Sequence, residues 1–436
     1  MSEHGHVDTV VIGAGHAGLA MSRLLTDAGR DHVVLDRGRI GERWRTERWD
    51  SLHLLTPNWM TRLPGWPYAG PDPDGFRSAS ELVGTLEKYA ASFAAPVVEG
   101  AAVRSVRQAG LQQYDVATDC GSFRTRHVVV ATGPHGTPNV PDALRGGDVE
   151  VRTSNQYRNP DQLAAGGVLV VGASSSGVQI ANELSRAGRD VVLAVGRHTR
   201  MPRRYRGMDA FWWMEQTGRT ARTIDEVRDA AAARAEPSLQ LVGRTGAGTA
   251  ADDLDLAVLQ ARGVRLAGRL ESLTGGTATF SDDLPQVVAA ADRQMHRFLD
   301  VVDDHIDRVG LTAEVWPPAR PRRVDLTPTP RSLDLGAEGI RTVLLATGFR
   351  PDHSWLHLPV LEPGGAIRQY RGVTAAPGVY VVGQRFQHRR DSGFIDGARH
   401  DARAVTTHLL TGSHPPLARA ERPGDRRGSA ETGRAV

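Results

Sequence analysis

The turn at residues 13–18 constrains the fold of this chain more than any other stretch. Residues 7–12 before it are mostly apolar and β-branched, which predicts a buried strand. The turn reads Gly-Ala-Gly-His-Ala-Gly and opens a helix. Gly13 permits a tight bend, Gly15 lets a pyrophosphate approach the backbone, and Gly18 lets the helix pack closely on the strand. Because the first turn of such a helix offers unpaired N–H groups to an anion, the stretch predicts a dinucleotide-binding unit.

The acid that such a unit needs stands at the end of the next strand. Residues 32–35 are followed by Asp36, whose carboxylate can accept hydrogen bonds from both hydroxyls of an adenosine ribose. We count Ala17 in the turn and Arg37 beside the acid among the expected contacts of the dinucleotide. A glycine turn alone is a weak signal, but strand, turn, helix, second strand and acid together predict dinucleotide binding.

A second unit of the same kind begins at residues 168–171, which are all apolar. They are followed by Gly-Ala-Ser-Ser-Ser-Gly, in which Ser174 replaces the middle glycine. A serine hydroxyl can still hydrogen-bond a phosphate, although its side chain limits how closely the backbone approaches. The residues of this turn that we expect to bind a second dinucleotide are Gly172, Ser174, Ser175, Ser176 and Gly177.

The strand at residues 190–195 is followed by an arginine instead of an acid. The sequence there is Gly-Arg-His, and an arginine at this point favours a 2′-phosphate, and so NADPH over NADH. Arg197 is the first candidate for the phosphate partner, and Arg203 or Arg204 is the second. The alternative is that all three are solvated side chains of an arginine-rich protein.

An Ala-Thr-Gly sequence occurs twice, at residues 131–133 and 346–348, each time after a buried apolar run. Small residues let the backbone approach a cofactor, so we expect Ala131, Thr132 and Gly133 to line the first site. Since the two copies flank the second glycine turn, the second unit is predicted to be inserted into the first. The predicted fold class is α/β, with two Rossmann-like dinucleotide-binding domains.

Composition narrows the remaining classes. A length of 436 residues favours two connected domains, and a hydrophobic content of 40% is enough for a core. The net charge of +3 is small and no stripe of arginines alternates with aromatics, so we expect no nucleic-acid partner. Cys120 is the only cysteine, which excludes an internal disulfide, a CxxC metal site and an active-site dithiol, and no metal is expected. No apolar run reaches transmembrane length and no signal-peptide pattern occurs, so we expect a cytoplasmic protein without a membrane partner.

The residues after Asp36 resemble the flavin-containing monooxygenase superfamily. The resemblance rests on Gly-Glu-Arg-Trp at residues 41–44 and on residues 50–57, and it extends roughly over residues 6–412. It is strongest to a bacterial branch that is itself similar to the plant indole-pyruvate monooxygenases. The resemblance implies FAD at the first glycine turn, NADPH at the second, and Trp44 packed near the flavin.

The same resemblance implies further contacts of the flavin. The backbone near Val103 is expected to contact the adenine, and Leu52 is expected beside the cofactor. His53 is expected either to pack against the isoalloxazine or to take part in the chemistry. Asn58 corresponds to an asparagine beside the flavin C4a and is the one catalytic candidate, although an asparagine after a proline is often only a turn former. Phe394 opens the last helix, whose N-terminal dipole is expected to stabilise reduced flavin.

Between the two units, residues 151–158 match a monooxygenase fingerprint only in part. Ser154 and Tyr157 fit the pattern FxGxxxHSxxY, but its phenylalanine is missing and Thr153 stands in the place of its histidine. In the resembling superfamily that histidine is expected of Baeyer–Villiger enzymes, so the departure favours oxygenation of a heteroatom.

The resemblance therefore leads us to expect an NADPH-dependent FAD monooxygenase that acts through a C4a-hydroperoxyflavin. Its partners would be dioxygen and a small organic substrate, oxygenated at nitrogen or sulfur, and a role in secondary metabolism would fit. One alternative is an FAD-dependent NAD(P)H reductase or oxidase that does not oxygenate a substrate. The other is a non-catalytic nucleotide-sensing flavoprotein. A homodimer is left open.

The long segment after the second unit is the least transparent part of the chain. Apolar residues recur every three or four positions from 284 to 309, which predicts a long amphipathic helix over the inserted domain or at a subunit contact. The expected division of the chain is a first part of an FAD domain at 1–145, an NADPH domain at 146–340 with a helical insertion at about 205–330, a second part of the FAD domain at 341–411, and a disordered tail at 412–436.

Overall fold

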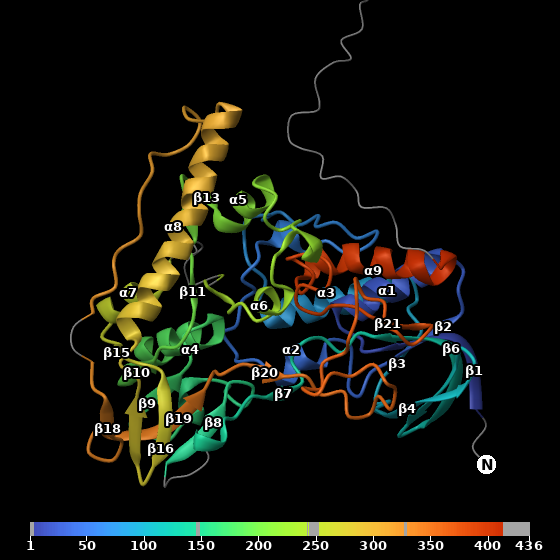
Figure 1. Ribbon diagram of the computed structural model, residues 1–436, viewed down its shortest axis with the longest axis horizontal. Coiled ribbons are helices and arrows are strands. Elements are labelled where there is room, and N and C mark those ends of the chain that lie inside the picture. The colour runs from blue at the N-terminus through green and yellow to red at the C-terminus, as the bar shows by residue number, and fades with distance from the viewer. Residues whose placement is uncertain (1–3, 145–148, 242, 244–252, 327–328, 413–436) are drawn as a thin grey trace, which may run out of the picture.

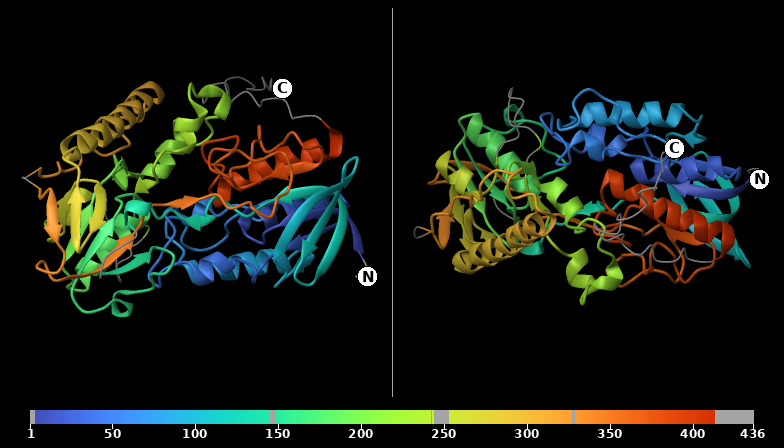
Figure 2. Two further views of the ribbon diagram at one scale, coloured as in Figure 1. Left: turned by 60° about the horizontal axis from the view of Figure 1, so that its bottom comes forward. Right: turned by 90° about the horizontal axis from the view of Figure 1, so that it is seen from above.

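The structure, a computed structural model, describes residues 4–144, 149–241, 243, 253–326 and 329–412. The chain forms two α/β units that lie side by side, one at the right and one at the left of Figure 1. The first strand and the last helix belong to the same unit, as both views of Figure 2 show. The second unit therefore stands between two parts of the first along the chain. The expected tail lies outside the described residues from residue 413 onward.

The first unit is built on a seven-stranded sheet of order β3-β2-β1-β6-β5-β4, with β21 also paired to β6. The pairings among β3, β2, β1, β6 and β21 are parallel, whereas β5 and β4 extend the sheet antiparallel. The strands are β1 (His4–Ile12), β2 (His32–Leu35), β3 (Val97–Val98), β4 (Val103–Gly110), β5 (Gln113–Thr118), β6 (Gly121–Val130) and β21 (Val379–Val381).

Successive residues of β1 enter two different cores. Val11 packs with the apolar faces of α1 (His16–Asp27), α3 (Ala79–Ala91) and α9 (Ile395–Thr411). Val10 and Ile12 pack on the opposite side of the sheet. Because both faces of a parallel sheet are covered, its inner strands are apolar throughout, which is the pattern that residues 7–12 led us to expect.

The second unit is built on a five-stranded sheet of order β15-β10-β9-β19-β8, in which every pairing is parallel. One face packs against α4 (Ser175–Arg186) and α7 (Leu256–Ala261), and the other against a small antiparallel sheet. The strands of both are β8 (Glu150–Thr153), β9 (Gly167–Val171), β10 (Val191–Ala194), β15 (Arg265–Ala267), β19 (Ile340–Leu345), β16 (Leu270–Thr274), β17 (Thr277–Phe280) and β18 (Ser332–Asp334). The predicted α/β class with two Rossmann-like units is confirmed.

The boundary expected between residues 340 and 341 falls elsewhere. β19 pairs with β8 and β9, so the second unit extends through this strand. The two connections between the units then run together, because β7 (Thr137–Pro138) pairs antiparallel with β20 (Phe349–Arg350). An apolar strand fits either sheet, and only its pairing decides which one it joins.

The predicted amphipathic helix is α8 (Leu284–Val309), which stands at the upper left of Figure 1. Its buried face joins α5 (Ala210–Gln216) in one apolar cluster, so Phe211, Trp213 and Met214 lie in the core and Trp212 lies at its edge. Val309, at the end of the pattern, is exposed. None of the helices in the described ranges is long and apolar enough to cross a bilayer.

The remaining elements are short. They are α2 (Glu42–Thr46), η1 (Asn58–Met60), η2 (Asp142–Leu144), η3 (Pro160–Gln162), β11 (Thr199–Arg200), β12 (Arg204–Tyr205), β13 (Met208–Asp209), η4 (Ile224–Glu226), α6 (Ala230–Arg234) and β14 (Leu239–Gln240).

Candidate functional site

The first glycine turn forms an open space at the N-terminus of α1. Gly13 has a φ of +114°, and a Cβ there would lie 2.6 Å from the carbonyl oxygen of Ala131. A Cβ on Gly18 would overlap the carbonyl oxygen of Gly13, whereas one on Gly15 would meet no atom of the described chain within 4 Å. No side chain among these residues caps α1. The turn thus presents unpaired N–H groups to an empty volume, which fits the diphosphate of FAD.

The second turn repeats this geometry. Gly172 has a φ of +104°, and a Cβ there would lie 2.6 Å from the carbonyl oxygen of Ala346, while a Cβ on Gly177 would overlap Gly172. Ser174 is the N-cap of α4, yet its hydroxyl makes no capping hydrogen bond within the described chain. The hydroxyl and the first N–H groups of α4 therefore fit a second diphosphate. Ser175 and Ser176 form the first turn of that helix.

The two Ala-Thr-Gly sequences have the same role in their respective units. Ala131 follows β6 and Ala346 follows β19, and each places its carbonyl against the first glycine of a turn and its methyl group near the last one. Thr132 continues the first of these strand ends, and Gly133 has a φ of +71° and accepts a hydrogen bond from Gln384 Nε2 at 3.2 Å. The sequence repeat thus has a packing cause that its spacing alone does not reveal.

The acid of the first unit lies beneath its turn. Asp36 accepts hydrogen bonds from the backbone N–H of Ala14 at 2.7 Å and of Gly38 at 2.9 Å, which fix its carboxylate. Arg37 is 59% exposed and pairs with Glu47 at 2.9 Å, so it has a partner on the protein surface. Val103, where β4 begins, and Ala17 in α1 lie in the same unit.

The loop after Trp44 contacts both units. Trp44 itself packs against the cores of the first and the second unit, and Leu52 is buried in the core of the second. His53 Nδ1 lies within hydrogen-bond distance, 3.0 Å, of the carbonyl oxygen of Ser51. These residues lie where the two units meet, which is where the resemblance expects the flavin.

Asn58 is 8% exposed and begins η1. Its Nδ2 donates to the carbonyl oxygen of Asp72 at 2.9 Å, and its Oδ1 is buried without a hydrogen-bond partner in the described chain. A buried acceptor without a partner is costly, so a bound group that donates a hydrogen bond fits here.

The last helix opens close to that loop. Phe394 is the N-cap of α9 and lies 5.7 Å, edge to face, from Phe211. Asp396, in the first turn, accepts from Arg62 at 2.6 and 2.8 Å and from Arg399 at 2.9 Å. Burial would raise the pKa of Asp396, but these hydrogen bonds outweigh it and hold the pKa below its usual range. Asp396, Asp391 and His400 could together approach one ion, yet arginines already pair with both carboxylates.

Two histidines near the first turn are neutral at neutral pH. Burial lowers the pKa of His16 to about 4, and its Nε2 has no hydrogen-bond partner in the described chain. Burial, together with the charges of Arg48 and Arg43, lowers the pKa of His135 to about 3. Burial also lowers the pKa of Arg48 to about 10, and its guanidinium lies over the ring of Trp44 and donates to the main-chain carbonyl of Glu47. The half-buried positive charge of Arg48 fits an anionic cofactor.

The two arginines expected at the 2′-phosphate differ in position. Arg197 is exposed just beyond β10 and donates to the carbonyl oxygen of Ala235 at 2.8 Å. Arg203 is 0% exposed, pairs with Asp209 and donates to the carbonyl oxygen of Leu55 at 2.7 Å. Its guanidinium is thus occupied in the interior, and the expectation that Arg203 contacts a 2′-phosphate is corrected accordingly.

Gln240, Leu241 and Gly243 connect the second turn with the loop around Leu54. Gln240 Nε2 donates to the carbonyl oxygen of Ala173 at 2.6 Å, and Gln179 Nε2 of α4 donates to that of Leu241 at 2.9 Å. Gly243 packs so closely on the carbonyl oxygen of Leu54 that a Cβ would overlap it. The loop around Leu54, which is expected to border the flavin, therefore lies close to the second glycine turn. No sequence motif marked these glutamines, since they reach the turn only through long-range folding.

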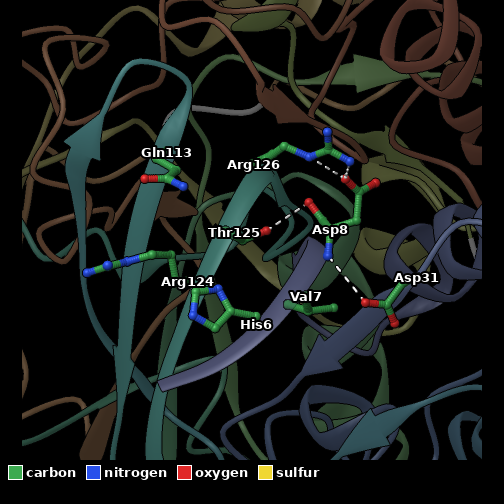
Figure 3. A pocket seen from close by; sticks show the side chains of 8 residues that line it. All are labelled: His6, Val7, Asp8, Asp31, Gln113, Arg124, Thr125 and Arg126. Atoms are coloured by element: carbon green, nitrogen blue, oxygen red, sulfur yellow. Dashed lines mark hydrogen bonds and ion pairs between the residues drawn. The ribbon is translucent and has the colours of Figure 1, made fainter. Parts of the chain in front are cut away.

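A hollow of ≈ 330 Å³ has no residue of either turn in its lining, and Figure 3 shows the side chains that line it. It is lined by the early part of β1 around Asp8, whose carboxylate pairs with Arg126, and by Asp31 before β2. In parallel sheets dinucleotides bind at the carboxyl ends of the strands, so this hollow is not the cofactor site. A smaller one, of ≈ 170 Å³, lies beyond β10 and includes Arg197.

Comparisons with known proteins agree with this geometry. The profile of the family described as pyridine nucleotide-disulphide oxidoreductase matches residues 10–208. An uncharacterized CzcO-like oxidoreductase of Geobacillus kaustophilus is 31% identical, over 93% of this chain and 98% of that protein. Indole-3-pyruvate monooxygenase YUCCA4 of rice (Oryza sativa subsp. japonica) is 32% identical over 40% of this chain and 44% of its own length.

Among solved structures, a flavin-containing monooxygenase from Stenotrophomonas maltophilia superposes with a TM-score of 0.64 at 20% identity. The match covers 93% of this chain and 98% of that one, and it supports the fold. The family and the two turns together imply FAD and a nicotinamide dinucleotide as cofactors. The chain belongs to the CzcO-like oxidoreductases.

Proposed function

We propose that this protein is an NADPH-dependent FAD monooxygenase that oxygenates a small organic substrate at nitrogen or sulfur. The observation that carries the proposal is the placement of Gln240 and Gly243. Gln240 binds the turn at Ala173, and Gly243 packs on Leu54 in the loop that precedes Asn58. A second turn that lies close to the loop expected beside the flavin supports hydride transfer between the two cofactors.

In this proposal the first unit is the FAD domain and the second the NADPH domain. The first N–H groups of α1, with Gly15 open to the diphosphate, bind FAD, and Asp36 binds its adenosine ribose. The serine turn at the start of α4 binds the second diphosphate, and Arg197 binds the 2′-phosphate. Bound FAD, reduced by NADPH, would supply the activation of dioxygen that the resemblance expects as a C4a-hydroperoxide.

The chain's own residues then have to hold the substrate and keep water out. A cluster of apolar side chains around α5 and α8 covers the loop at Asn58, with Trp59, Trp212 and Phe394 partly buried at its edge. Such a wall excludes the water that would otherwise destroy a reactive oxygen adduct. Asn58, with its unpartnered Oδ1, is the residue that we assign to the reacting atoms.

The test measures whether the electrons of NADPH end in an oxygenated product or in hydrogen peroxide. Purified protein would be mixed with NADPH and oxygen in the presence of a panel of small amines and thioethers. We expect at least one substrate to yield close to one oxygenated product for each NADPH consumed, and rapid mixing of reduced protein with oxygen to reveal a long-lived absorbing adduct. Hydrogen peroxide as the sole product with every substrate would instead indicate a reductase or oxidase. Tight binding of both cofactors without flavin reduction would indicate a sensor.

A further inference from the structure

The hollow beyond β10 lies where a Rossmann unit reads the 2′-position of the adenosine ribose. In the first unit the acid at this place, Asp36, directly follows its own strand. In the second unit the strand ends without an acid, but the fold brings Glu236 into the hollow together with Arg197. Glu236, whose carboxylate would favour NADH, and Arg197, whose guanidinium would favour NADPH, thus line the same hollow.

Glu236 is held by both units of the protein. Its Oε1 accepts a hydrogen bond from Gln294 Nε2 of α8 at 2.5 Å, and its Oε2 accepts one from Arg390 in the loop before α9 at 2.6 Å. Arg385, in the same loop, donates to the main-chain carbonyl of Glu236. The Glu236 side chain remains 20% exposed. The carboxylate is therefore fixed and still open to a ligand.

Arg197 is held by the neighbouring residue. Its guanidinium donates to the carbonyl oxygen of Ala235, next to Glu236 in the chain, and is otherwise exposed. A guanidinium favours a 2′-phosphate. A carboxylate accepts a hydrogen bond from a 2′-hydroxyl, and it repels the two negative charges of a phosphate. Each residue therefore reduces the preference that the other creates.

We infer that Glu236 is a specificity-determining residue that opposes Arg197, so that the protein accepts NADH as well as NADPH. The inference rests on the proposed function insofar as that function assigns a nicotinamide dinucleotide to the second turn. It adds that coenzyme choice is set by a residue of the inserted segment, and that this residue is tied to the loop before α9 through Arg390.

The experiment compares the wild type with Glu236→Gln and Arg197→Ala. A glutamine still accepts from Arg390 or Gln294 but carries no charge. Titration calorimetry of the FAD-loaded protein with 2′,5′-ADP and with 5′-AMP isolates the 2′-phosphate, and the KM for NADPH and NADH follows turnover. Glu236→Gln should lower the Kd for 2′,5′-ADP and the KM for NADPH by about tenfold. The same variant should raise the KM for NADH. Arg197→Ala should do the opposite.

Glu338→Gln is the matched control. Glu338 is also paired with an arginine, Arg265, where β15 begins and so at the other end of the sheet, and its removal should change neither ligand. If Glu236→Gln leaves the ratio of the two affinities unchanged, or weakens 2′,5′-ADP, the inference is overturned. If the wild type binds both nucleotides but never reduces its flavin, the proposed function fails while the inference on specificity stands.

Discussion

At the residue scale, Gly15 is the position that distinguishes cofactor binding from folding. Its backbone is extended, with φ −80° and ψ −178°, so any residue can adopt it, and the space above it is open. Gly15→Val should therefore fold and yet fill the place of the diphosphate. We expect the purified variant to be colourless, with a flavin content near zero by absorbance.

Gly84→Val serves as the control for that variant. Gly84 lies in α3, and a Cβ there would likewise meet no described atom within 4 Å. This variant should remain yellow. A yellow Gly15→Val protein would show that the first turn does not hold the flavin.

Asn58 is predicted to affect coupling, which is the yield of oxygenated product per NADPH consumed, rather than flavin binding. Asn58→Ala removes the hydrogen bond to Asp72 and the unpartnered Oδ1, and we expect product per NADPH to fall several-fold while the flavin content stays constant. Asn58→Asp keeps an acceptor and loses the donor, so it separates the two roles. Equal coupling in all three proteins would make Asn58 a turn former, the alternative that its sequence context left open.

Asp401 gives the protein a pH dependence of stability. The residue is 0% exposed in α9, and burial raises its pKa to about 8. Because the folded state holds this proton more tightly than the unfolded state, Asp401 costs stability increasingly as the pH rises from about 5 to about 8. Asp401→Asn cannot ionise, so its Tm should exceed that of the wild type by a margin that widens over this range.

Thermal unfolding at several pH values measures that margin. Asp27→Asn is the control, since Asp27 is a surface carboxylate paired with Arg23 on α1, and its margin should be small. A constant difference between Asp401→Asn and the wild type would mean that Asp401 is ionised in the folded protein over the whole range.

At the element scale, one buried arginine joins three elements of the second unit. Arg200, on β11, is 2% exposed and pairs with Asp255 at 2.6 Å and with Asp292 of α8 at 2.6 Å. Asp255 also caps α7. Arg200→Ala leaves a buried carboxylate without its partner, which typically costs about 3–5 kcal/mol.

Chemical denaturation checks this cost. Arg331→Ala is the matched control, because Arg331 forms an exposed pair with Asp282 and its loss should cost less than about 1 kcal/mol. Equal losses of unfolding free energy in the two variants would show that Arg200 stabilises the second unit no more than an exposed ion pair does.

Elements marked by local chemistry could be predicted from the sequence, and those set by distant partners could not. The glycine turns were visible because a missing Cβ is required at fixed positions, and α8 was visible because its apolar face repeats. Arg203 was misplaced because its partners, Asp209 and Leu55, come together only in the folded chain. Glu236 was missed because it lies far along the chain from the end of β10 and reaches the hollow beside Arg197 only in the folded protein.

At the scale of the whole molecule, the cofactors should contribute to stability. A ligand that binds only the folded chain stabilises it by about 2.7 kcal/mol at a hundredfold excess over its Kd. Removal of FAD should therefore lower the Tm, and added FAD should restore it. Added NADP⁺ should raise the Tm further, since the second turn is separate from the first. An unchanged Tm after flavin removal would contradict binding to the folded first turn.

The order of the two units could be read from the chain, since two Ala-Thr-Gly sequences enclose the second turn. Their boundary could not, because β19 is as apolar as a strand of either sheet and only its pairing with β8 and β9 assigns it. Pairing over long sequence separations leaves no local pattern.

The pairing of β7 with β20 has a mechanical consequence. Two strands that are hydrogen-bonded along their length resist shear but yield to bending across the ribbon that they form. The two connections between the units are therefore tied to each other at the crossing, and neither can slip along the other without breaking these hydrogen bonds.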